Sequence, residues 1–246
     1  MNDFMICGAL LYDGTGHPPY PADVAVTESR VAAVAPAGKL HRTGFREIRA
    51  DGLSLSPGFI DAHGHSDVSI LAAPEASGKI SQGVTTEITG NCGLSAFPVL
   101  TDEVREHLDN LYAAYHVPIT WSTLDDYATE LNRREPAINI ASLCWHNTLR
   151  ANISGYGGRT LAAAELNRMA ELLGQALHQG AAGLSTGLLY TPGRFADTAE
   201  LLHLMSVLKK FDRLYATHLR SEGDQLTEAL EEAVFLAKNG SRKLQV

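Results

Sequence analysis

Cysteine is scarce in this sequence, long hydrophobic runs are absent, and basic residues are outnumbered by acidic ones. Three cysteines, an odd number spread over 246 residues, argue against a disulfide framework. No run approaches 18 apolar residues, so no membrane-spanning helix is predicted. A formal net charge of −8 argues against nucleic acid or an anionic membrane as a partner.

Basic residues are also missing from the start of the chain, where the first one is Arg30. A secretory signal begins with a positively charged segment, so we expect a cytoplasmic protein. Apolar residues make up 45% of the chain and charged residues 20%, a balance typical of a soluble globular protein. A disordered chain would be poorer in apolar residues and richer in charge.

The chain changes character near Pro57. Residues 1–56 contain short β-rich runs separated by turn signals such as Asp13-Gly14-Thr15-Gly16, which predicts a small all-β unit. Residues 57–246 alternate short apolar strands with longer amphipathic segments. This alternation predicts βαβ units and a parallel sheet, hence an α/β fold. Five strands are expected, at 58–62, 83–88, 138–144, 182–185 and 214–218, and residues 243–246 are a candidate start of a sixth.

Three helices are predicted between these strands, at 161–179, 199–211 and 222–239. The first shows Leu166, Met169, Leu173 and Leu177 on one face, and the third aligns Leu226, Leu230 and Val234. Asp197 or Thr198 is expected to cap the second helix. Five or six βαβ units form either an open sheet or part of an eight-stranded barrel, and barrels carry their chemistry at the carboxyl ends of the strands.

Metal-ligating residue types follow the first two of these strands. His63 and His65 are two residues apart, so on a strand both imidazoles point to one face, and Gly64 between them is expected to leave room for an ion. Cys92 lies between glycines, which suits a core poorly and a zinc ligand well. Each motif alone has an ordinary alternative: solvated loop histidines for the pair, a buried thiol for the cysteine.

The later strands add further candidates. His218 ends the fifth strand and is a credible third nitrogen ligand. Together His63, His65, Cys92 and His218 form a mixed nitrogen and sulfur set that favours zinc. Tyr190 lies in a glycine-rich loop and could donate a hydrogen bond to an oxyanion. His146 and Arg220 are candidate substrate-binding residues, although a buried, hydrogen-bonded His146 is the more frequent situation. Cys7 and Cys144 are expected in the core.

The chain resembles the amidohydrolase superfamily, and within it the D-aminoacylases, also called N-acyl-D-amino-acid deacylases. Four motifs carry the resemblance: His63-Gly64-His65-Ser66-Asp67, Gly90-Asn91-Cys92-Gly93, residues 180–193, and the segment Thr217-His218-Leu219-Arg220-Ser221-Glu222. The resemblance implies a metal-dependent (β/α)8 barrel, incomplete here, beside a small N-terminal β-sandwich. It also implies zinc-dependent hydrolysis of an N-acyl-D-amino acid to a carboxylate and a free D-amino acid.

The resemblance assigns a role to each candidate residue. Cys92 would take the place of the carboxylated lysine found in many amidohydrolases, and with His218 and one further histidine would hold the tight zinc. His63 and His65 would contribute to a second, weaker site, and Tyr190 would stabilise the oxyanion. The expected partner is a small-molecule N-acyl amino acid.

Family members are roughly twice as long, and their remaining histidine ligand and catalytic aspartate would lie beyond the sixth strand. We therefore expect these 246 residues to be the N-terminal half of such an enzyme, inactive alone. Asp61, Asp67 and Asp224 match no family position for the general base. The alternatives are a dihydroorotase- or hydantoinase-like cyclic amidase, against which Cys92 argues, and a non-catalytic metal-binding fragment.

Overall fold

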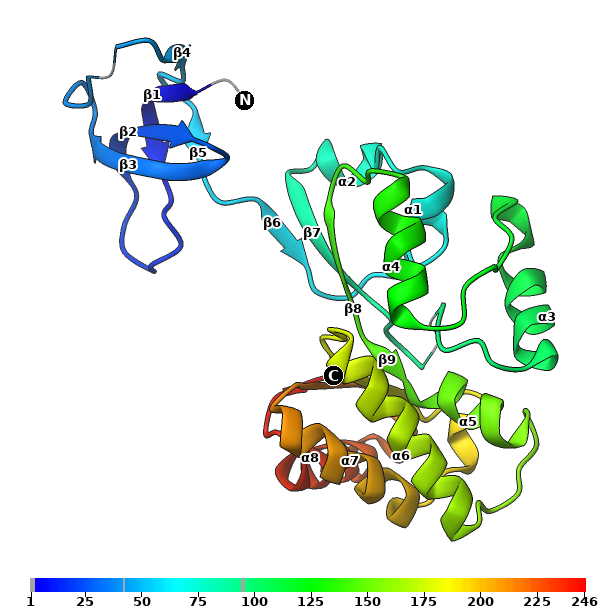
Figure 1. Ribbon diagram of the computed structural model, residues 1–246. Helices are drawn as coiled ribbons and strands as arrows, with labels where there is room; N and C mark the ends of the chain where they lie inside the picture. Colours follow the sequence, from blue (N-terminus) through cyan, green and yellow to red (C-terminus); the bar gives the residue numbers. More distant parts are fainter. Residues whose placement is uncertain (1–2, 42, 94–95) are drawn as a thin grey trace. The chain divides into compact units, whose positions relative to one another are not determined.

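A computed structural model of the protein describes residues 3–41, 43–93 and 96–246. The chain divides into two compact units, Met1–Gly58 and Phe59–Val246. Each unit has its own hydrogen-bonded sheets (Figure 1). Among the described residues, no helix combines the length and the apolar character needed to cross a membrane.

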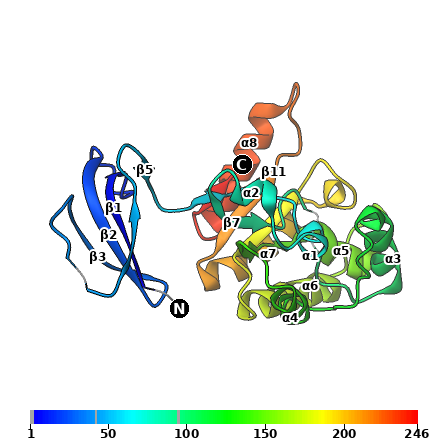
Figure 2. The same cartoon turned by 90° about the horizontal axis from the view of Figure 1, so that it is seen from above.

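The first unit is built on one five-stranded sheet (Figure 2). Its strands run in the order β3-β2-β1-β4, with β5 also pairing with β1: β1 (Phe4–Leu11), β2 (Tyr20–Thr27), β3 (Arg30–Pro36), β4 (Arg46–Arg49) and β5 (Ser54–Leu55). Strand β1 continues through Gly8, whose φ of +76° accommodates a register shift against β2. Alternate residues of β1, such as Met5 and Leu11, are buried.

The second unit contains two short parallel sheets. The first pairs β6 (Phe59–Asp61), β7 (Val84–Thr89) and β8 (Asn139–Ser142), and the second pairs β9 (Cys144–Trp145), β10 (Gly183–Gly187), β11 (Leu214–His218) and β12 (Leu244–Gln245). Strands β8 and β9 are interrupted only at Leu143, whose N–H donates to the Thr89 carbonyl at 2.9 Å. Six parallel strand positions thus follow one another in chain order, as the sequence predicts.

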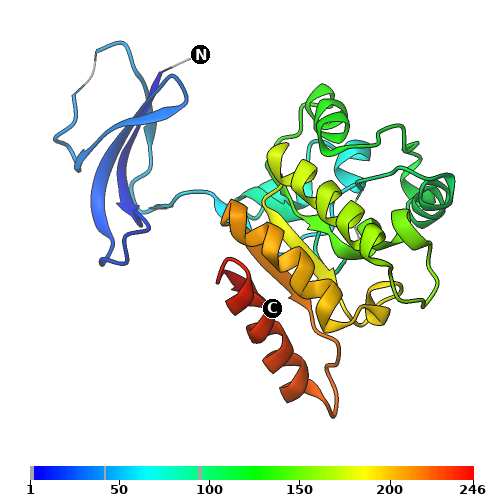
Figure 3. The same cartoon turned by 60° about the horizontal axis from the view of Figure 1, so that its bottom comes forward.

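Three helices lie side by side on the outer face of β9–β12: α6 (Ala163–His178), α7 (Thr198–Phe211) and α8 (Leu226–Asn239) (Figure 3). All three were predicted, with α6 beginning two residues later. Met169, Leu173 and Leu177 of α6 are buried as expected. Asp197 caps α7, accepting the Glu200 N–H at 2.8 Å.

The predicted apolar face of α8 is wrong. Leu226, Leu230 and Val234 are exposed, whereas Ala229, Ala233, Leu236 and Ala237 are buried. The small alanines bring α8 close to the sheet, and the Leu226 stripe points away from it. Helical spacing indicates which residues share a face, but not which face meets a partner.

The remaining helices had not been assigned from the sequence. They are α1 (Ser69–Ala72), α2 (Ser77–Ile80), α3 (Asp102–Leu111), α4 (Leu124–Arg133) and α5 (His146–Ser154), with the 3-10 turns η1 (Ala113–Tyr115) and η2 (Gly193–Phe195). Two of them carry readable start signals. Thr101 caps α3, and Thr123 forms a capping box with Asp126 at α4.

Candidate metal centre

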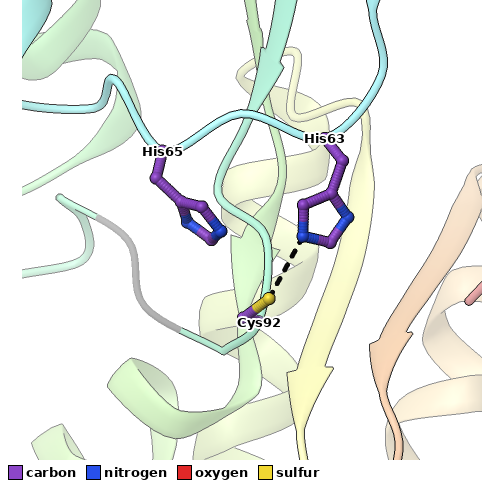
Figure 4. Close-up of side chains that lie close together, drawn as sticks. All are labelled: His63, His65 and Cys92. Atoms are coloured by element: carbon purple, nitrogen blue, oxygen red, sulfur yellow. Dashed lines mark hydrogen bonds between the residues drawn. The ribbon is translucent and has the colours of Figure 1, made fainter.

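His63, His65 and Cys92 converge on one point (Figure 4). The two histidines lie in the turn after β6, and Cys92 lies in the turn after β7. His63 Nε2 is 3.2 Å from Cys92 Sγ, and the two imidazole centroids are 5.3 Å apart. One ligand atom from each residue lies within 4.8 Å of the others. This spacing brings two nitrogen donors and one sulfur donor together, as the sequence predicts.

The Cys92 turn is shaped by left-handed backbone. Cys92 has a φ of +57°, between Gly90 at +81° and Gly93 at +75°. A Cβ on Gly90 would come within 2.5 Å of the Leu143 carbonyl oxygen, so only glycine permits this approach of the turn to the neighbouring strand. The glycines thus serve to place the thiol at the edge of the sheet.

Gly64 does not provide room for an ion, contrary to the sequence-based expectation. A Cβ at this position would lie 1.8 Å from Glu87 Oε1, so the space beside Gly64 is filled by a carboxylate. Glu87 is fully buried on β7 and accepts the Ser66 N–H at 3.2 Å. The histidine turn therefore lies directly against the Glu87 side chain.

The electrostatic surroundings of His65 and Cys92 bear on metal binding. Burial lowers the pKa of His65, as does the nearby His63, so the neutral, metal-binding form of the imidazole is favoured. Burial raises the pKa of the Cys92 thiol, and the Glu222 carboxylate raises it further. A thiolate at this position therefore needs a cation beside it, which zinc supplies. The donor set fits zinc better than magnesium or calcium.

Tyr190 and His218 form a second pair near the carboxyl ends of β10 and β11. Their rings are 4.8 Å apart, and Tyr190 Oη is 3.5 Å from His218 Nδ1. His218 Nε2 is buried without a hydrogen-bond partner and lies 3.4 Å from Glu222 Oε1. A buried imidazole nitrogen without a hydrogen bond is available to a ligand.

The two groups are linked through Gly187. Gly187 pairs with His218 in the sheet, and a Cβ on Gly187 would lie 2.0 Å from the Cys92 carbonyl oxygen. Burial and His63 are the main causes of the low pKa of His65, but His218 also contributes. His218 is nevertheless outside the tight group formed by His63, His65 and Cys92.

His146 is not brought to this site. It begins helix α5 instead of ending a strand, and its side chain is fully buried. Its Nε2 lies 2.7 Å from Glu200 Oε1, and Arg150 Nε donates to the same carboxylate at 3.1 Å. The structure thus corresponds to the buried, hydrogen-bonded alternative, which leaves no imidazole surface for a substrate.

Arg220 is equally engaged within the fold. Its guanidinium donates twice to Glu232, from Nε and Nη2 at 2.9 Å each. It also donates to the carbonyl oxygens of Arg194 and Ala196, at 3.0 and 3.1 Å. Arg220 therefore anchors the η2 turn to α8, and its donors are already occupied in this arrangement.

Asn147 was not singled out from the sequence, yet it joins the loops that carry the candidate residues. Its Nδ2 donates to the Gly187 carbonyl at 3.2 Å. Cβ atoms on Gly93 and Gly193 would lie 2.7 and 2.2 Å from the Asn147 Oδ1. One buried amide thus packs against the Cys92 turn and the Tyr190 loop. The sequence feature that could have identified Asn147 is its place beside His146, just after a predicted strand.

Asp67 is also structural. It is fully buried, and burial raises its pKa to about 7 while the Gly90 and Asp67 N–H groups oppose that rise. The Gly90 N–H donates to Asp67 Oδ2 at 3.4 Å. Asp67 therefore helps to hold the Cys92 turn in place through its contact with Gly90. Cys7 and Cys144 are buried, which confirms the expectation for both.

Comparison with known proteins assigns the chain to a family. Residues 46–238 match the model of the amidohydrolase family. The N-acyl-D-aspartate deacylase of Alcaligenes xylosoxydans xylosoxydans is 39% identical over 237 residues, covering 96% of this chain and 47% of that protein. The D-aminoacylase of the same organism is 35% identical, covering 94% of this chain and 47% of that protein.

A solved structure shows the same relationship. The N-acyl-D-glutamate deacylase of Bordetella bronchiseptica, crystallised with zinc and a phosphonate inhibitor that mimics the tetrahedral intermediate, is 36% identical. It superposes with a TM-score of 0.86 over 96% of this chain and 49% of that one. The chain spans about half the length of the relatives that it matches. From its matched residues and its fold, the chain belongs to the amidohydrolase family.

Proposed function

We propose that this chain carries the metal-holding part of a zinc-dependent hydrolase that cleaves N-acyl-D-amino acids to a carboxylate and a free D-amino acid. The observation that carries the proposal is the convergence of His63, His65 and Cys92 at the carboxyl ends of neighbouring parallel strands. Relatives named N-acyl-D-aspartate deacylase, D-aminoacylase and N-acyl-D-glutamate deacylase support the substrate class.

Zinc would be held tightly by Cys92 and His218, and a weaker second site would use His63 and His65. Support for His218 as a ligand comes from its buried, unpartnered Nε2. Bound there, zinc would lower the pKa of water toward neutrality and polarise the amide carbonyl.

Tyr190 would donate a hydrogen bond to the oxyanion that develops as the amide is attacked. Burial, Cys92 and Glu222 raise the pKa of Tyr190, so its phenol keeps its proton at neutral pH. The side chain is partly exposed beside His218 and can therefore approach a substrate.

We do not assign the general base to Asp61 or Asp67. Lys79 binds the Asp61 carboxylate, and Asp67 is buried beneath the Cys92 turn. We propose that the general base and a further histidine ligand are not among the candidate residues described above. We further propose that the six parallel strand positions belong to an eight-stranded barrel, that the first unit belongs to a β-sandwich, and that the enzyme works in the cytoplasm.

The test combines metal content with substrate choice. Zinc per chain is measured after dialysis of the size-fractionated protein, beside the Cys92→Ala variant. Release of free amino acid is then followed from N-acetyl-D-aspartate, N-acetyl-D-glutamate and N-acetyl-D-leucine, with the L enantiomers and hydantoin as controls. We expect about one zinc per chain, lost in Cys92→Ala, and zinc-dependent release from D substrates when the complete reading frame is expressed.

The controls separate the alternatives. Turnover of hydantoin without turnover of N-acyl-D-amino acids would make the protein a cyclic amidase. Zinc binding with no turnover of either class, in the complete protein, would favour a non-catalytic metal-binding role. Hydrolysis of L and D substrates at equal rates would contradict the proposed stereochemistry.

A further inference from the structure

Lys79 contacts the two carboxylates, Asp61 and Glu87, that lie next to the turn carrying His63 and His65. It belongs to the short helix α2, and its ammonium group binds the Asp61 carboxylate through Oδ2. The same Nζ is 3.4 Å from Glu87 Oε2, an oxygen with no hydrogen bond of its own. One ammonium therefore lies between two carboxylates that come from neighbouring strands, β6 and β7.

Both carboxylates use their other oxygen to hold the backbone of the histidine turn. Asp61 Oδ1 accepts the His63 N–H at 3.2 Å, at the start of the turn. Glu87 Oε1 accepts the Ser66 N–H at 3.2 Å, at its end. The two ends of the segment 63–66 are thus fixed by two carboxylates that share Lys79.

The middle of the turn is fixed as well. The Gly64 N–H donates to the Ile88 carbonyl at 2.9 Å, and Gly64 rests against Glu87 where a Cβ would clash. Asn91, next to Cys92, donates from Nδ2 to the Gly64 carbonyl at 3.3 Å. A shift of Glu87 would therefore move the backbone between both histidines, relative to Cys92.

We propose that Lys79 is a positioning residue that sets the spacing of His63 and His65 for metal binding by neutralising and bridging Asp61 and Glu87. This inference rests on the proposed metal site. Glu87 is completely buried, and a buried carboxylate deprived of its cation is strongly unfavourable. Without Lys79, Glu87 and Asp61 would repel each other, and the turn that they hold would change its shape.

The expected loss of metal affinity can be judged from residues in other proteins that hold metal ligands in place without binding the metal themselves. Loss of such a partner typically lowers metal affinity by about 10- to 100-fold. The alternative is that Lys79 contributes only to stability, as an ordinary partly buried ion pair does. Only a positioning role predicts that replacing Lys79 changes the metal affinity and the spectrum of the bound metal.

The experiment compares Lys79→Met and Lys79→Arg with wild type and with Lys243→Met. Lys243 is a matched control, because its Nζ binds Asp212 Oδ2 at 2.7 Å on an exposed surface. Arginine keeps the charge, and Lys79 lines a cavity of about 600 Å³ that gives the larger guanidinium space. The readouts are zinc affinity against a competing chelator, the visible spectrum of the cobalt-substituted protein, and the unfolding midpoint.

We expect the affinity of the weaker site, which His63 and His65 form, to fall by about 10- to 100-fold for zinc in Lys79→Met, with altered cobalt bands, and to recover largely in Lys79→Arg. Lys243→Met should match wild type. Wild-type zinc affinity and cobalt spectrum in Lys79→Met, with only a lower unfolding midpoint, would overturn the inference. Should Lys79→Met fold poorly, Lys79→Gln provides the same uncharged comparison. Failure of the complete wild-type protein to bind zinc would instead overturn the proposed function, and the inference with it.

Discussion

The two groups of candidate residues in the second unit are held very differently. The turns that carry His63, His65 and Cys92 rest on buried carboxylates and on glycines in close contact with neighbouring backbone. Tyr190 and His218 touch each other loosely, at 3.5 Å, and Tyr190 is partly exposed. The first group is therefore organised by its surroundings, and we expect the Tyr190 side chain in the second group to be the more adjustable.

The sharpest test of this comparison removes the thiol from the organised group. Cys92→Ala deletes the one sulfur donor, and we expect zinc affinity to fall by more than the roughly 100-fold that loss of an outer partner causes. Competition with a chelator measures the affinity, and circular dichroism checks the fold. A variant that still bound zinc as tightly as wild type would show that Cys92 is not a ligand.

The next largest effect is expected from the buried cluster of Glu200, Arg150 and His146. Glu200→Ala would leave Arg150 and His146 buried without their carboxylate, at a cost of about 3–5 kcal/mol in unfolding free energy. Urea denaturation measures it. Exposed Glu171, which pairs with Arg168, is the control: Glu171→Ala should cost about 1 kcal/mol or less. Equal losses of unfolding free energy in both variants would show that the buried pairs of Glu200 stabilise the fold no more than an exposed ion pair does.

Tyr190→Phe tests the adjustable group. In the complete, active enzyme we expect kcat to fall by about 10²- to 10³-fold, the usual effect of losing one oxyanion donor. Zinc content and unfolding midpoint should stay unchanged, because the hydrogen bond from the phenol to His218 Nδ1 is long, at 3.5 Å. A loss of zinc together with the loss of rate would place Tyr190 in the organised group instead.

The smallest effect is expected on the outer face of α8. Leu230→Ser should change the unfolding free energy by no more than about 0.5 kcal/mol, since Leu230 is 44% exposed. On the opposite face, Leu236→Ala should cost about 2–5 kcal/mol, because Leu236 is fully buried. Thermal or urea unfolding of both variants checks the contrast. A large loss in Leu230→Ser would mean that this stripe is covered in solution.

The sequence by itself determined the order of strands and helices and the identity of the candidate metal donors. Alternating apolar segments revealed six parallel strand positions, and the residues after two of them named His63, His65 and Cys92. These features are readable because backbone periodicity and ligand chemistry are local properties of the chain. The capping signals of α3 and α4 were equally local, but they were not used.

Tertiary structure decided how those residues are supported and which candidates reach the site. His146 proved to be buried against Glu200, the space beside Gly64 was taken by Glu87, and α8 turned its alanines inward. Each outcome depends on a partner far away in the sequence, and helical or strand spacing carries no information about that partner. Lys79 and Asn147 gain their importance in the same way, because their contacts exist only once separate strands and loops have been brought together.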